Sequence, residues 1–137
     1  MMKSTDELEH EIREAASPSP LSGDGFTPPP LPEYLRGLLA ERGATVGDMV
    51  VRCGLDRSYA YQLFNGTRRP TRNFLLLLSL VLDLEESEVQ RLLKIAGRNP
   101  LYARDRRDAG LLYAFSHGLS PEEADSLLRD LGQEGLF

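Results

Sequence analysis

Arginine and amide side chains gather between residues 52 and 72 of this 137-residue chain. Five arginines in this stretch accompany a single acidic residue, Asp56, which gives a local charge of +4 although the whole chain carries −5. Arginine forms paired hydrogen bonds with guanine or with phosphate oxygens, and glutamine pairs with adenine in the same way. These residue types therefore point to recognition of a nucleic-acid duplex rather than to covalent catalysis.

The spacing within residues 57–65 separates two helix faces. Ala60, Leu63 and Phe64 fall together at helical periodicity, so they form the expected core face. The outward positions contain arginine, serine, tyrosine and glutamine, with no acid after Asp56. We expect the side chains that read base edges in the major groove to be Arg57, Ser58, Tyr59, Tyr61 and Gln62.

The residues that follow this helix suit phosphate oxygens. Two arginines lie in the loop, and the N-terminus of the next helix offers free backbone N–H groups. Arginines beside a turn are often only a solvated surface, so the interpretation rests on their placement around one candidate reading helix. The expected phosphate contacts here are Asn65, Thr67, Arg68, Arg69, Thr71 and Arg72.

From Leu31 onward the chain contains helix start and stop signals, and no segment alternates polar and apolar residues as a strand would. Glycines predict helix ends, and Thr45, Asp56 and Ser120 predict N-caps. One helix, starting after Thr71, is apolar nearly all round and must be surrounded by others. The fold class is therefore all-α, with the other helices expected at about 32–42, 46–53, 57–65, 85–96, 105–117 and 120–131.

The helices at 46–53 and 57–65, joined by Gly54, Leu55 and Asp56, have the spacing of a helix-turn-helix. Residues 31–84 resemble the Xre and lambda-repressor family, in which a glycine ends the first helix, an apolar plug follows and the reading helix ends in Asn-Gly. The matching residues are Met49, Val50, Gly54, Leu55, Ala60, Leu63, Phe64, Asn65, Gly66 and Pro70.

This resemblance implies a lambda-repressor-like five-helix bundle that binds a palindromic operator as a homodimer. By position it implies base contacts from Arg57, Ser58, Tyr59 and Gln62, and phosphate contacts from Asn65 and Arg68. The family often has a phosphate-binding glutamine or threonine at the first residue of the first of these helices. This chain has Val46 there, so its neighbour Thr45 is the candidate phosphate contact.

Composition divides the rest of the chain. Residues 1–16 read as an acidic tail with a possible weak helix, 17–31 as a Pro/Ser/Gly linker, 32–84 as the DNA-binding domain and 85–137 as a helical extension for packing or dimerisation. A shift of 64 residues lays the helix-turn-helix pattern onto the last two helices. Its outward positions are the acids Glu122, Glu123 and Asp125, which would repel phosphate, so a plain helical hairpin is the favoured interpretation.

Several function classes find no support in the residues. The single Cys53 and two distant histidines favour neither a disulfide nor a metal site, and we expect no cofactor and no enzymatic activity. No apolar run reaches the roughly 18 residues of a membrane span, and we expect a cytoplasmic, nucleoid-associated protein.

Two functions stay open at this point. The acid-free outward face of residues 57–65 favours sequence-specific binding of double-stranded DNA by a small transcriptional regulator. The acidity of the whole chain favours a protein-interaction module of the same fold with little or no DNA binding. In that alternative, the acidic tail, the helix at 120–131 or the helix at 57–65 itself contacts a protein partner.

Overall fold

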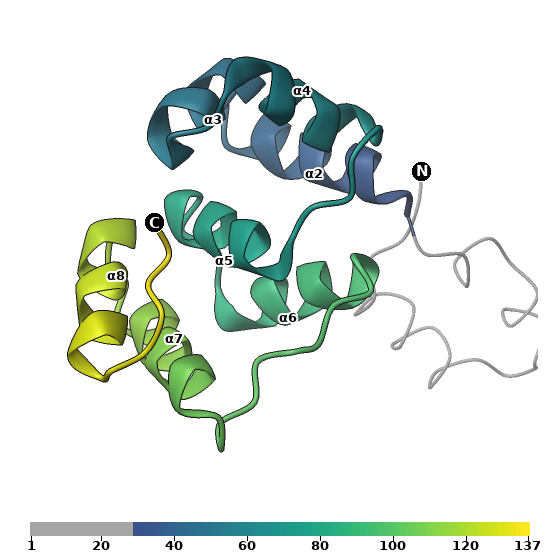
Figure 1. Cartoon of the computed structure of the whole chain (residues 1–137). Helices are drawn as coiled ribbons and strands as arrows, with labels where there is room; N and C mark the ends of the chain where they lie inside the picture. Colours follow the sequence, from purple (N-terminus) through teal and green to yellow (C-terminus); the bar gives the residue numbers. More distant parts are fainter. Residues whose placement is uncertain (1–28) are drawn as a thin grey trace, which may run out of the picture. The chain divides into compact units, whose positions relative to one another are not determined.

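The computed structural model describes residues 29–137, so the expected acidic tail and the expected linker up to residue 28 lie outside the described residues. Leu31–Phe137 forms one compact unit, and no strand occurs within it (Figure 1). The all-α prediction is confirmed, whereas the lambda-repressor-like arrangement stays a prediction. The helices in this range are α2 (Leu31–Glu41), α3 (Val46–Cys53), α4 (Arg57–Asn65), α5 (Arg72–Val81), α6 (Glu86–Ile95), α7 (Arg106–Ser116) and α8 (Pro121–Asp130).

Three helices begin at the side-chain caps that were predicted for them. Thr45 and Asp48 form a reciprocal capping box at α3, and Ser120 and Glu123 form another at α8. Asp56 caps α4 by accepting a hydrogen bond from the third backbone N–H of that helix. Because each cap satisfies a backbone donor that the helix itself leaves free, these residues fix where the helices start.

Helix α5 forms the centre of the unit. Every residue from Phe74 to Val81 is buried, as expected for a helix that is apolar all round. Ser79 is fully buried too, and its hydroxyl donates to the Leu75 carbonyl at 2.6 Å, so the core contains no unpaired polar group at this position. Helix α5 lies between α2–α4 on one side and α6–α8 on the other (Figure 1). One hydrophobic core therefore joins residues on both sides of α5.

Arginines bind the C-terminal ends of neighbouring helices. Arg52 donates to the Val81 carbonyl at the end of α5 at 2.6 Å. Arg36 donates to the Phe64 carbonyl near the end of α4 at 2.9 Å. The last carbonyls of a helix lack partners within the helix and carry its partial negative charge, so a guanidinium satisfies both needs. These arginines therefore fasten helices to one another.

A partly buried ion pair fixes the N-terminal end of α5. Arg72 donates to both carboxylate oxygens of Asp108 on α7, at 3.0 and 2.9 Å, and also to the carbonyls of Asn99 and Pro100. The Tyr102 backbone N–H donates to the same carboxylate at 3.0 Å. Asp108 is only 6% exposed, so these bonds replace the water that its charge has lost. The pair thereby ties α5 to the loop before α7.

The last described residues lie against the helices. Leu136 is buried, and its backbone N–H donates to Asp125 on α8 at 2.7 Å. Its carbonyl accepts from Asn73 on α5, and Arg107 on α7 donates to the neighbouring Gly135 carbonyl. Three helices therefore hold this segment in place. Among residues 29–137, no helix has the length and apolarity needed to span a bilayer.

We predict that Cys53 reacts slowly while the protein is folded. Its side chain is buried, and burial raises the pKa of the thiol to about 11 despite the opposing charge of Arg52. Below that pH the group is a neutral thiol, whereas the thiolate is the reactive species. A colorimetric disulfide reagent at pH 8 should label Cys53 only after urea is added. Fast labelling of the folded protein would contradict this placement.

We predict that Arg72→Ala lowers the free energy of unfolding by about 3 kcal/mol, because it leaves the buried Asp108 carboxylate without its cation. Urea unfolding monitored by circular dichroism measures the change. Arg104→Ala is the matched control, because Arg104 is exposed and forms no hydrogen bond or ion pair with the described residues. Equal stability of the two variants would show that the ion pair contributes little.

Candidate nucleic-acid interface

Helices α3 and α4 form a hairpin around a short turn. Gly54 has a φ of 65°, a left-handed conformation that glycine adopts without steric cost. This conformation lets the Leu55 backbone N–H donate to the Val50 carbonyl at 3.0 Å and close the end of α3. Asp56 then caps α4 through the Tyr59 backbone N–H at 3.0 Å. The turn therefore has the geometry that its sequence predicted.

Helix α4 has one buried face and one outward face. Ala60, Leu63 and Phe64 are at most 2% exposed, so the prediction of the core face is confirmed. The predicted base-reading residues occupy the remaining positions. Arg57, Ser58 and Tyr61 are exposed, while Tyr59 and Gln62 are partly buried.

Arg57 at the start of α4 is available to a ligand. It forms no hydrogen bond or ion pair with any residue of the range 29–137, and α4 itself contains no acidic residue. All five guanidinium donors are consequently free for an external acceptor. A fork of parallel donors matches the paired acceptors of a guanine edge or of a phosphate group.

Arg68, predicted as a phosphate contact, lies close to two of the predicted base-reading residues. Its Nε donates to Oε1 of Gln62 at 3.1 Å, and its guanidinium carbon lies 5.3 Å from the centre of the Tyr59 ring. The remaining donors of Arg68 bond no described residue. The contact restrains the Gln62 side chain and leaves its amide N–H groups free to donate. Gln62 and Arg68 therefore form one polar unit at the end of α4.

No sequence pattern predicted this unit. The two residues are six positions apart, and the turn at Gly66 brings them together. The Arg68 backbone N–H also donates to the Gln62 carbonyl, at 3.1 Å. One sequence signal could have predicted the unit. An arginine follows the Asn-Gly helix end by two residues, and a glutamine lies in the last turn of the helix.

Arg69 and Arg72 bind this protein's own polar groups. Arg69 donates to the carbonyls of Ala96 and Gly97 at the end of α6, at 3.2 and 3.3 Å. Arg72 is engaged with Asp108 and the loop before α7. Both guanidinium groups therefore have internal acceptors, and the geometry favours a structural role for them over the predicted phosphate contacts.

The remaining predicted phosphate contacts are exposed residues at helix ends. Thr45 and Thr71 each accept a hydrogen bond, at 3.1 Å, from a backbone N–H in the first turn of α3 and α5 respectively. The Asn65 side chain accepts from the Thr67 backbone N–H at 2.9 Å and shapes the loop after α4. The threonine hydroxyls can still donate, because capping uses only their oxygen lone pairs.

Helices α7 and α8 repeat the geometry of the first hairpin. Gly118 has a φ of 62°, and the Leu119 backbone N–H donates to the Ala114 carbonyl at 3.0 Å, which is the same bond shifted by 64 residues. Similar helix ends occur elsewhere, with left-handed residues at Gly97 and at Asp83. Because this stop is common to several helices of the chain, the repeat follows from ordinary helix termination, and the plain hairpin stays the favoured interpretation.

Arg57 and Arg68 therefore present available donors on the outward surface around α4. Arg57 has all its donors free, and Arg68 has two free nitrogens beside Gln62. Within residues 29–137, no three potential metal-ligating side chains come together. No family model, curated protein or solved structure matches this chain.

Proposed function

We propose that this protein binds double-stranded DNA sequence-specifically and acts as a small transcriptional regulator. The observation that carries the proposal is the partner-free Arg57 on the acid-free outward face of α4, held in a helix-turn-helix hairpin. The major groove, about 12 Å wide, admits one α-helix, and its base pairs differ in their donors and acceptors. In this proposal α4 enters that groove.

The outward residues of α4 have distinct roles in this proposal. Arg57 donates to the two acceptors of a guanine, while Ser58 and Tyr61 contact neighbouring base edges. Gln62 donates its amide hydrogens to a base acceptor, since its carbonyl oxygen already accepts from Arg68. Tyr59 is partly buried, so its ring packs against the guanidinium of Arg68 and does not reach far into the groove.

The phosphate contacts in this proposal come from the exposed residues around α4. Arg68 is the main cation, and Asn65, Thr67, Thr45 and Thr71 are candidate polar contacts. Arg69 and Arg72 act indirectly, because they hold α6 and the loop before α7 against α5. We further propose a homodimer on a palindromic operator, as the resemblance to the Xre and lambda-repressor family implies.

The first test is selection of bound duplexes from a random pool at near-physiological salt, with the native protein and with Arg57→Ala. We expect a short palindrome for the native protein. In the variant, preference at one base of each half-site should be lost, at a cost of about 1 to 3 kcal/mol, because one bidentate contact is missing. Arg104→Ala, which removes an exposed arginine outside α4, should select the native sequence. The absence of any enriched sequence would support the interaction module instead.

A second test compares two neighbouring arginines. Arg68→Ala should reduce the slope of log affinity against log salt by about 0.9, because one phosphate contact is lost. Arg69→Ala should reduce the slope less, because bonds from one guanidinium nitrogen hold its side chain at the end of α6. Fluorescence anisotropy of a labelled duplex at several salt concentrations measures both slopes. Equal reductions in the two variants would contradict the assignment of Arg68 to phosphate contact and of Arg69 to a structural role.

A further inference from the structure

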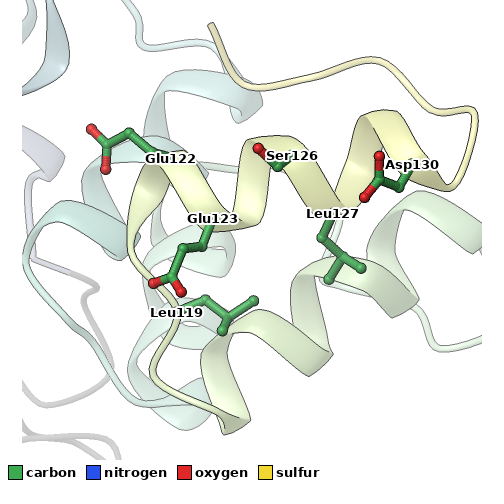
Figure 2. A pocket seen from close by; sticks show the side chains of 6 residues that line it. All are labelled: Leu119, Glu122, Glu123, Ser126, Leu127 and Asp130. Atoms are coloured by element: carbon green, nitrogen blue, oxygen red, sulfur yellow. The ribbon is translucent and has the colours of Figure 1, made fainter.

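Helix α8 and the turn before it form an open groove of about 460 Å³ (Figure 2). Figure 2 shows Glu123 beside Leu119, with Leu127 one turn farther along α8. Leu119 and Leu127 are partly buried and supply apolar surface, while the other lining residues are polar. The lining residues are Leu119, Glu122, Glu123, Ser126, Leu127 and Asp130.

The carboxylates of this groove are not neutralised by the protein. Glu122 and Asp130 form no hydrogen bond or ion pair with the described residues. The backbone N–H of Ser120, and then its hydroxyl, lower the pKa of Glu123, so this group is charged at neutral pH. Arg129, the one basic residue of α8, is bonded to Asp125 at 2.9 Å instead. The groove therefore carries three negative charges that have no cationic partner among the described residues.

The spacing of these residues fits a helical partner. Glu122, Ser126 and Asp130 recur every four residues, so they follow one stripe of α8, with about 12 Å between its ends. Leu127 follows Glu123 by four residues on the adjacent stripe, and Leu119 extends this apolar strip. Cations two turns apart on a partner helix can therefore face the two terminal acids while an apolar residue between them contacts the leucines.

Charge narrows the choice of occupant. The same face of a second copy would bring like charges together, and duplex DNA would meet three carboxylates. The chain's own first 30 residues contain six acidic and two basic side chains, so they share the sign of the groove. Only a cationic segment complements it.

We propose that the groove of α8 binds a cationic amphipathic helix of another protein, through the carboxylates of Glu122 and Asp130 and the apolar strip of Leu119 and Leu127 beside them. Helix α8 lies on the opposite side of α5 from α3 and α4 (Figure 1). The protein partner and the proposed DNA ligand consequently occupy different faces of the molecule. The groove proposal goes beyond the proposed function, because it does not depend on DNA binding.

The experiment titrates the full-length, isotope-labelled protein with a synthetic peptide and records amide chemical shifts at near-physiological salt. The probe is an alanine-based peptide of about 16 residues, long enough to hold a helix, with lysines eight positions apart and leucines between them. Shift changes should concentrate between Leu119 and Asp130. A second peptide has serine in place of the leucines and keeps both lysines, and it should bind more weakly because the apolar contact is lost.

Charge-reversal variants locate the binding site. Glu122→Lys with Asp130→Lys should weaken binding by about tenfold, since two favourable charge contacts become repulsive. The control, Glu33→Lys with Glu86→Lys, makes the same change in net charge at exposed acids on α2 and α6 and should leave the affinity unchanged.

Four results would overturn the proposal. They are undetectable binding, shift changes spread over the whole acidic surface, an equal loss in the control variant, and equal binding of the serine peptide. Sedimentation of the protein alone adds one further outcome. Self-association that Glu122→Lys with Asp130→Lys abolishes would assign the groove to a second copy of the chain.

Discussion

The burial of α5 is the constraint on which the rest of the structure depends. A helix that is apolar from Phe74 to Val81 must be covered on all sides, because exposing it would cost about 25 cal/mol for each Å² of apolar surface. Helices α3, α6 and α8 all contact it. Its covering leaves α3, α4 and α8 each with one face against the core and one face toward solvent, and the two proposed binding surfaces are outward faces of this kind.

Burial of α5 also determines how the chain uses its arginines. The last carbonyl of α5 accepts a hydrogen bond from Arg52. Arg72, the first residue of α5, bonds the buried Asp108. Arg69 likewise bonds the end of α6. A local excess of arginines therefore does not by itself indicate a binding surface for anions. Of the basic side chains around α4, Arg57 bonds no described residue and the Arg68 side chain donates only to Gln62 on the same surface, whereas Arg52, Arg69 and Arg72 donate to other elements.

Local signals in the sequence predicted the helices and their starts. Thr45, Asp56 and Ser120 cap the helices that they were expected to cap, because a cap depends on residues only three positions apart. The partners of Arg69 and Arg72 lie 27 and 36 residues away, and no local pattern connects them. The face of a helix can thus be read from periodicity. Whether an arginine on the surface has an internal acceptor depends on tertiary packing.

The most direct test of the central claim places a photo-crosslinking amino acid at Ser58 on α4 or at Ser126 on α8, and irradiates each protein with a random-sequence duplex at low salt. Both serines are exposed, so neither replacement disturbs the core. We expect crosslinks to DNA from position 58 and none from position 126, where the neighbouring carboxylates repel phosphate. Crosslinks from position 126, or from neither position, would contradict the assignment of α4 to the major groove.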